Sequence, residues 1–282
     1  ALEYLKEFKK NKKRDNKILQ MQLLGYECEV VFSPIFSKNE KFKGMVIVLR
    51  NITEKKLAQN LRKEFSANVT HELKTPLTSI LASSEMIKNG LVAKEDLPEF
   101  IDKIALESKR LLEMIDEILK ISFLDECDEE VLKKNRINLK NMVLNVIKRL
   151  QLVAQKNDIA IIPKLEDCSI IGVNELLENL IFNLCDNAIK YNKKGGFVEI
   201  VLEKLPNEVV FRVKDSGVGI PKEYLSRIFE RFFCVDQGRS KKLGGSGLGL
   251  SIVKSALKYN NAQIEVKSEV GVGSEFIVHF KI

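Results

Sequence analysis

The spacing of apolar residues along the chain changes twice and divides it into three regions. From residue 17 to residue 52, apolar residues alternate with polar ones or form β-branched runs, as in "YECEVVFSPIF" and "KGMVIVLRNIT". Such runs predict strands, and the breaks at Gly25 and "SKNEKFKG" predict an antiparallel meander. Three strands alone make a poor domain, so we expect them to be the end of a larger fold.

From Thr53 onward the apolar positions recur at steps of three and four, which predicts one long helix ending at about residue 89. Gly90 stands where a helix stop is expected, and "AKEDLPEF" begins a second helix of the same kind. A single helical hairpin leaves its apolar stripe half covered. We therefore expect a homodimer in which two hairpins form a four-helix bundle.

The rest of the chain mixes strand-like and helical segments. "LDECDEE" (124–130) is acidic and has no apolar period, which indicates a hinge. Beyond it lie two helical segments, "NELLENLIFNLCDNAIKYN" and one that opens at "GLGLSIVKSALKY". Five runs predict strands: "AIIPKL", "FVEIVLEKL", "EVVFRVKD", "AQIEVKSE" and "SEFIVHFKI". The pattern predicts an α/β sandwich with helices on one face of a sheet, within an α+β multidomain chain.

Charge and cysteine content exclude some classes of function. The net charge of +7 is densest in "KEFKKNKKRDNK" (6–17), but acids interrupt this run and no aromatic ladder accompanies it. A solvated helix or loop is therefore favoured over a nucleic-acid surface, and we expect no nucleic-acid partner. The five cysteines are odd in number and form no C-x-x-C pair, which argues against a disulfide framework and a zinc site and fits a reducing cytoplasm.

Membrane attachment is expected only through residues outside this sequence. No apolar run approaches the length of a membrane span. The chain begins with Ala1 and has no leader, so we expect it to be the cytoplasmic portion of a longer sensor of bacterial type that an upstream anchor holds at a membrane.

The glycine-rich stretch "GGSGLGLS" (244–251) matches neither the dinucleotide fingerprint nor the P-loop. It precedes a predicted helix, so its bare backbone N–H groups and the positive end of the helix dipole suit phosphate oxygens. Taken alone, the stretch is equally compatible with a simple loop.

A polar stripe runs along the predicted helix 174–192, where Asn179, Asn183, Asn187 and Lys190 are spaced by four, four and three residues. Amide oxygens suit a Mg²⁺ ion that takes its other ligands from water and nucleotide phosphates. A solvated face is the alternative, although asparagine is a mediocre helix former. In "DSGVGI" (215–220), Asp215 ends a strand and could accept a base amino group. "GVGSEF" (271–276) could be only a turn.

In order along the chain, "VTHELKTPLT", "NLIFNLCDNAIKYN", "DSGVGI", "IFERFFCVD", "GGSGLGLSIVK" and "GVGSEF" resemble the H, N, G1, F, G2 and G3 boxes of two-component sensor histidine kinases. The resemblance covers about residue 54 to the end and is greatest to the phosphate-regulon and cell-wall sensor kinase class. The strands before it look like the tail of a PAS domain. The implied limits are a PAS-like end (1–52), a dimerisation and phosphotransfer domain (53–124), a hinge (125–135) and a Bergerat-type ATP-binding domain (136–282).

The resemblance makes His71 the phosphoacceptor. A neutral imidazole offers one lone pair for attack on a phosphoryl group while a carboxylate holds the proton of the other nitrogen. The family pattern gives that general-base role to Glu72. It gives Thr75 the placing of a water that attacks the phosphoaspartate of a response regulator. Pro76 removes a helix hydrogen bond to Glu72, so we expect a bend beside the histidine. His279 is expected to be structural.

The resemblance also assigns the nucleotide site. It implies Asn187 as the metal ligand for Mg²⁺, Asn183 and Lys190 on phosphates, Tyr191 against adenine, and Asp215 on its amino group. Further implied nucleotide contacts are Gly217, Gly219, Ile220, Arg231, Arg239, Lys242, Gly245, Gly247, Leu248, Gly249 and Ser274. Phe229, Phe232 and Phe233 would anchor a lid or be ordinary core aromatics. Cys234 stands where relatives often carry a polar residue, which departs from the pattern at one lid contact.

The expected function is that of an ATP-dependent histidine kinase that phosphorylates His71 and passes the group to an aspartate of a response regulator, with regulator phosphatase as a second activity. Chaperone and topoisomerase relatives carry a water-activating glutamate where this chain has Asn183, so we expect ATP to be held rather than hydrolysed. The alternative is a signalling scaffold that binds nucleotide without transferring phosphate.

Overall fold

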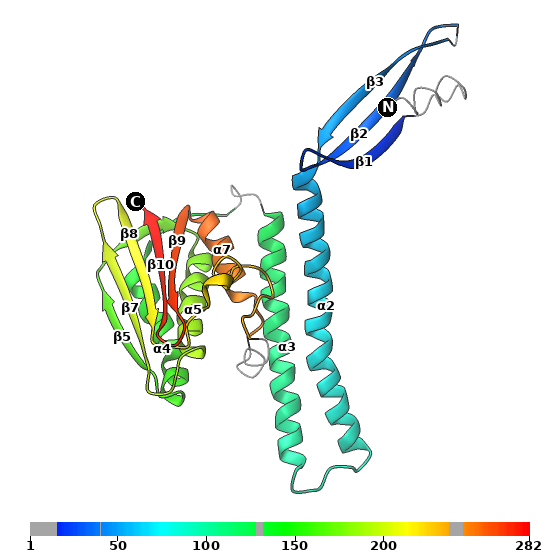
Figure 1. Ribbon diagram of the computed structural model, residues 1–282. Helices are drawn as coiled ribbons and strands as arrows, with labels where there is room; N and C mark the ends of the chain where they lie inside the picture. The colour runs from blue at the N-terminus through cyan, green and yellow to red at the C-terminus, as the bar shows by residue number, and fades with distance from the viewer. Residues whose placement is uncertain (1–15, 40, 128–131, 237–244) are drawn as a thin grey trace. The chain divides into compact units, whose positions relative to one another are not determined.

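The computed structural model describes residues 16–39, 41–127, 132–236 and 245–282 and divides the chain into two compact units, Ala1–Thr70 and His71–Ile282 (Figure 1). The basic run at 6–17 lies almost wholly outside the described residues.

The first unit contains the predicted meander. Strands β1 (Lys17–Leu23), β2 (Tyr26–Phe36) and β3 (Phe42–Asn51) pair antiparallel in the order β1-β2-β3. Val30 and Phe32 of β2 form its buried apolar cluster. The long helix α2 (Thr53–Lys88) begins against this sheet, because Thr53 Oγ1 accepts a hydrogen bond from the backbone N–H of Glu27 at 3.0 Å.

The predicted helical hairpin is confirmed. Helix α2 ends at Lys88, one residue before the predicted end, and Gly90 follows with a φ of 68°. Helix α3 (Leu97–Glu126) begins within "AKEDLPEF", as predicted, and has proline in its first turn. Large apolar side chains stay exposed on both helices, among them Leu77, Leu81, Ile101, Leu112 and Leu119. This exposed stripe is the feature from which a dimeric bundle was predicted.

A five-stranded sheet forms the C-terminal domain, and all five strands predicted there are confirmed. The sheet has the order β5-β7-β8-β10-β9, in which β5 and β7 are parallel and the other neighbours antiparallel. The strands are β5 (Ala160–Leu165), β7 (Phe197–Lys204), β8 (Glu208–Asp215), β9 (Ala262–Glu269) and β10 (Gly273–Lys281). The short pair β4 (Asn135–Asn138) and β6 (Ser169–Gly172) was not predicted, because four residues are too few to show a period.

Helices α4 (Leu139–Lys156), α5 (Asn174–Lys190) and α7 (Gly249–Tyr259) cover one face of this sheet (Figure 1). A single-turn helix, η2 (Lys222–Tyr224), follows β8. Helix α4 was missed, although its buried positions recur at steps of three and four and Asn138 caps it by accepting from the N–H of Asn141 at 3.0 Å. The predicted α/β sandwich is confirmed. Its core is the apolar layer between helices and sheet, with Val143, Leu177, Leu180, Val198, Phe211 and Val278 fully or almost fully buried.

The end of α3 belongs to this core. Leu124 is buried in the cluster, and the Tyr259 hydroxyl lies 2.6 Å from the carbonyl oxygen of Leu124. The acidic stretch at 124–130 was predicted to be a hinge without apolar period, but the structure extends the helix through Glu126. Residues 128–131 lie outside the described residues.

Within the part of the chain that the structure describes, no helix has both the length and the apolar character needed to cross a bilayer. All five cysteines carry free thiols.

Candidate functional site

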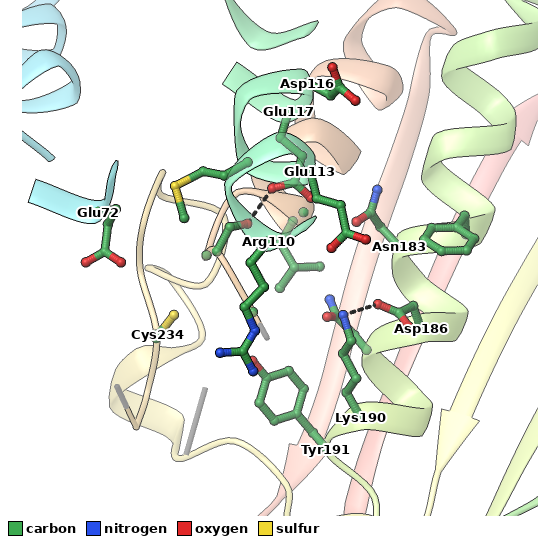
Figure 2. Close-up of a pocket in the computed structure, with 18 of the residues that line it drawn as sticks. Glu72, Arg110, Glu113, Asp116, Glu117, Asn183, Asp186, Lys190, Tyr191 and Cys234 are labelled. Carbon is green, nitrogen blue, oxygen red and sulfur yellow. Dashed lines mark hydrogen bonds and ion pairs between the residues drawn. The ribbon is translucent and has the colours of Figure 1, made fainter. Parts of the chain in front are cut away.

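A cleft of about 740 Å³ lies between the helical hairpin and the C-terminal domain, within the unit His71–Ile282 (Figure 2). Its walls come from α2, α3, α4, α5, the segment 228–234 and the glycine-rich segment before α7. These segments are far apart in the sequence, and the cleft brings four of the predicted motifs together.

Helix α5 supplies one wall of the cleft through Asn183, Asn187 and Lys190. Asn183 donates from Nδ2 to the carbonyl of Asn179 at 2.8 Å, which leaves its Oδ1 directed at the start of α7. Lys190 forms an ion pair with Asp186, with its Nζ 2.7 Å from Oδ2. Asn179 does not line the cleft. The predicted stripe is therefore a cleft wall along three of its four positions.

Gly249, the first residue of α7, explains why the N-terminus of this helix can approach α5 so closely. A Cβ atom at this position would lie 2.4 Å from Oδ1 of Asn183, which is shorter than any normal contact. A residue with a side chain would require the Asn183 amide to turn away or the glycine-rich segment to shift. The glycine thus joins two of the predicted motifs at one place.

The glycine-rich segment is also tied to the phenylalanine motif. Gly247 has a φ of 74°, and its carbonyl accepts a hydrogen bond from the N–H of Phe232 at 2.9 Å. Phe232 itself has a φ of 61°, which is uncommon for a residue other than glycine. Leu248 is completely buried and its N–H donates to Ser246 Oγ at 3.1 Å. Phe229 and Phe233 pack against the core.

Asp215 lies at the end of β8 in a second group of predicted site residues. The residue is 8% exposed, and its Oδ1 accepts hydrogen bonds from the N–H groups of Gly217 at 2.7 Å and Ser274 at 3.2 Å. Burial raises the pKa of Asp215, while these two hydrogen bonds pull it down. The structure thereby brings together the predicted Asp215 and Ser274. Neither lines the 740 Å³ cleft.

Close backbone packing surrounds Asp215 at the glycines. A Cβ atom on Gly217 would lie 2.3 Å from the carbonyl oxygen of Tyr191, and one on Gly219 would lie 2.0 Å from that of Glu269. Tyr191 lines the cleft and also meets the Asp215 group through its carbonyl, which accepts from the N–H of Val218 at 3.1 Å. The two groups of predicted residues are therefore continuous through Tyr191.

A serine pair beside this group was not predicted. The N–H of Ile220 donates to Ser268 Oγ at 2.7 Å, and the Ser268 and Ser274 hydroxyls are 2.9 Å apart. Ser268 lies inside a strand-like run, so no local signal distinguished it from an ordinary alternating position.

The predicted phosphoacceptor helix reaches the cleft through Glu72 and Thr75. His71 is exposed and does not itself line the cleft. Thr75 Oγ1 donates to the carbonyl of His71 at 3.3 Å, within the same helix turn. The other histidine, His279, lies 3.1 Å from Glu208 at the sheet, in keeping with its predicted structural role.

Helix α3 contributes cleft residues that were not predicted from the sequence. Arg110, Glu113 and Glu117 line the cleft from one face of α3, and Arg110 extends toward Tyr191 (Figure 2). Their spacing of three and four residues was the available signal. This spacing does not stand out in the sequence, because the same helix also carries an apolar stripe that predicts dimerisation.

The three cationic residues predicted to contact phosphates, Arg231, Arg239 and Lys242, are not found together in the cleft among the described residues. Arg231 forms an ion pair with Asp125 of α3 at 2.6 Å, so in this arrangement it contacts a carboxylate. Arg239 and Lys242 lie outside the described residues. Cys234 and Gly245 line the cleft.

Two family models match the chain in the segments that form this site. The family described as His Kinase A (phospho-acceptor) domain matches residues 61–127, and the family described as Histidine kinase-, DNA gyrase B-, and HSP90-like ATPase matches residues 172–282. A phosphoacceptor hairpin followed by this ATPase fold defines a class of signalling protein. The chain belongs to the two-component sensor histidine kinases.

Curated relatives agree with this assignment. The chain is 31% identical over 258 residues to the sensor protein kinase WalK of Staphylococcus aureus, which covers 90% of the chain and 62% of that protein. The WalK protein of strain JH9 matches at the same identity over 42% of its length. The chain therefore spans about half the length of these relatives.

Solved structures share the fold. Histidine kinase ThkA, in a crystal structure with the response regulator protein TrrA, is 24% identical with a TM-score of 0.63, covering 98% of this chain and 81% of that chain. The Acinetobacter baumannii histidine kinase AdeS is 20% identical with a TM-score of 0.61, covering 75% of this chain and 97% of that chain. At these identities the likeness concerns the fold alone.

Proposed function

We infer that the chain is an ATP-dependent protein histidine kinase that phosphorylates His71. The observation that carries this inference is the shared cleft: Glu72 and Thr75, which follow the histidine on its helix, line the same cleft as Asn187 of α5. A phosphate donor bound along α5 would therefore lie beside the phosphoacceptor helix. Placing donor and acceptor together supplies much of the rate enhancement in group transfer.

The ATPase family match implies ATP binding, and the residues present fit that ligand. Both backbone N–H groups donate to Oδ1 of Asp215, so Oδ2 is the oxygen that would accept a hydrogen bond from the amino group of adenine. Gly217 and Gly219 leave the backbone bare at this end. These features support the assignment of the base-binding end to the Asp215 group, with Ile220 and Ser274 beside it.

The phosphate end is assigned to the cleft. Asn183, Asn187 and Lys190 line it, and the N-terminus of α7 with Gly245, Gly247, Leu248 and Gly249 approaches them. Amide oxygens on one helix face suit Mg²⁺, for which Asn187 is the proposed ligand. When bound, the ion would neutralise charge on the phosphates. The helix N-terminus favours anions for the same electrostatic reason.

Transfer requires His71 to reach the terminal phosphate. One ring nitrogen attacks phosphorus through its lone pair, the bond from the γ-phosphorus to the bridging oxygen breaks, and ADP leaves with those electrons. Glu72 is the proposed base that holds the proton of the other ring nitrogen. Since His71 does not line the cleft, the ATP domain and hairpin must move relative to each other before this step.

The partners follow from the same proposal. The phosphoryl group passes from His71 to an aspartate of a response regulator, and Thr75 places the water that later removes it. The solved complex of ThkA with TrrA is an example of such a pair in a protein of the same fold. The exposed apolar stripe of α2 and α3 supports a homodimer. The family matches at 61–127 and 172–282 support the domain limits 53–124 and 136–282, and residues 1–52 are proposed to be PAS-like.

The test is incubation of the chain with Mg²⁺ and γ-labelled ATP, followed by acid and alkali treatment. The proposal expects a label that is lost in acid, kept in alkali and absent from His71→Gln. The matched control is His279→Gln, which removes the chain's other histidine and should keep the label. Label that persists in His71→Gln would exclude His71 as acceptor. Nucleotide binding with no label in any variant would favour the signalling scaffold instead.

A further inference from the structure

Helix α3 places a carboxylate on the glycine-rich segment. Ser246 Oγ donates a hydrogen bond to Oε2 of Glu117 at 2.5 Å, and the same Oγ accepts from the N–H of Leu248 at 3.1 Å. Figure 2 shows Glu117 reaching from α3 into the cleft beside Glu113, opposite the wall that carries Asn183 and Lys190. The hydroxyl of Ser246 is thus fully oriented, with its proton committed to Glu117.

Three further contacts hold α3 in this position. Asp125, about two turns after Glu117, forms the ion pair with Arg231 at 2.6 Å. Between them, Leu124 is buried in the core and its carbonyl oxygen lies 2.6 Å from the Tyr259 hydroxyl. The C-terminal third of α3 is therefore fastened to the ATP domain by one apolar and three polar contacts, two of which use carboxylates.

These carboxylates contact groups that a nucleotide needs. Ser246 belongs to the segment proposed to bind phosphates, and Arg231 is a proposed phosphate contact. A carboxylate and a phosphate carry the same sign and accept the same hydrogen bonds, so the two cannot share one donor without strong repulsion. Lys190, the cation of the facing wall, is already paired with Asp186.

We propose that Glu117 of α3 is an autoinhibitory residue, whose carboxylate competes with the phosphates of ATP for the Ser246 end of the glycine-rich segment. This inference rests on the proposed function, because it needs that segment to bind ATP. Nucleotide binding and release of α3 are then one coupled equilibrium, and each favours the other by the same factor. A signal that moves α3 away from the ATP domain would load the site with nucleotide.

The experiment is a titration of the full chain with Mg²⁺ and a non-hydrolysable ATP analogue. Glu117→Ala should bind the analogue about tenfold more tightly, since a hydrogen bond to a charged group no longer competes. Asp102→Ala is the matched control. It removes an exposed carboxylate of the same helix that does not line the cleft, and it should change the affinity less than about twofold.

A double-mutant cycle identifies the contact itself. In a Ser246→Ala background, Glu117→Ala should have no further effect on affinity, because the bond is already absent. Equal affinity of wild type and Glu117→Ala would overturn the inference, as would an undiminished effect of Glu117→Ala in the Ser246→Ala background. Failure of every variant and the wild type to bind the analogue would instead refute the proposed ATP site.

Discussion

The backbone N–H of Ser274 donates a hydrogen bond to Oδ1 of Asp215 at 3.2 Å and so links two segments that are 59 residues apart in the chain. The N–H of Gly217 donates to the same oxygen at 2.7 Å. Two backbone donors therefore fix the orientation of the carboxylate. Oδ1 accepts both of these bonds, and Oδ2 accepts neither of them.

This orientation predicts the effect of Asp215→Asn on nucleotide binding. The amide oxygen would keep the two backbone donors, so Nδ2 must take the place of Oδ2. A donor would then face the amino group of adenine, and affinity for the ATP analogue should fall about 10-fold to 100-fold. Asp158→Asn, which removes an exposed carboxylate of the same domain, is the control and should leave the affinity unchanged.

Asp215→Asn, which should weaken nucleotide binding, should instead increase the stability of the fold. Burial raises the pKa of Asp215 above its ordinary value of 3.8, so the folded protein holds this proton more tightly than the unfolded chain. The group therefore stabilises the fold at low pH, and this contribution is lost as the pH rises through the raised pKa. Relative to wild type, Asp215→Asn should gain thermal stability between about pH 4 and pH 7. A difference in melting temperature that is constant over this range would contradict the prediction.

Gly219 and Gly271 provide a matched pair for backbone strain. Both have a positive φ, of 70° and 82°, but a Cβ at Gly219 would lie 2.0 Å from the carbonyl oxygen of Glu269, while one at Gly271 meets nothing within 4 Å. Gly271→Ala should cost about 1–2 kcal/mol from the left-handed conformation alone. Gly219→Ala should cost at least about 3 kcal/mol, because the backbone must also shift. Denaturant unfolding of the two variants measures their free energies of unfolding. Equal destabilisation of both would show that the close approach to Glu269 adds no cost at Gly219.

Thr75 is expected to separate two activities. Thr75→Ala should abolish dephosphorylation of the regulator and retain phosphorylation of His71, because the threonine is proposed to place a water and has no role in transfer to the histidine. Thr78→Ala is a close control, since both threonines donate to the carbonyl four residues earlier, at 3.3 and 2.8 Å, while Thr78 does not line the cleft. Loss of both activities in Thr75→Ala would indicate a structural role.

The contact of Glu117 with Ser246 should depend on pH. The pKa of Glu117 is raised above its ordinary value, chiefly because the group is buried. The hydrogen bond from Ser246 and the positive charges of Lys190 and Lys120 partly offset this rise, whereas the negative charge of Glu113 adds to it. Burial outweighs the bond from Ser246, so Glu117 takes up a proton more readily when α3 is packed against the ATP domain. This packing is therefore favoured below the ordinary value of 4.5 and weakens as the pH rises through the raised pKa.

This dependence can be read from nucleotide affinity. As the pH increases above about 4.5, the wild type should bind the ATP analogue increasingly well relative to Glu117→Ala, which lacks the titrating group. Comparing the two proteins cancels the titration of the nucleotide itself. Parallel pH profiles would show that Glu117 does not titrate against the site.

The sequence alone determined the elements and most of the motifs. Apolar period predicted the meander, the helical hairpin and the five strands, because each element must bury one face at its own period. The spacing of Asn183, Asn187 and Lys190 was sufficient to place them on one helix face. The period of α4 was equally clear and was overlooked, and β4 and β6 are too short to show one.

Only the tertiary structure decided what these faces contact. The bond between Ser246 and Glu117, the ion pair of Arg231 with Asp125 and the burial of Leu124 join α3 to the ATP domain. No local pattern specifies them, since a charged position on an amphipathic helix looks the same whether it meets water or another domain. Local periodicity reports which face of an element is buried, whereas the partner of a polar side chain depends on how distant segments pack.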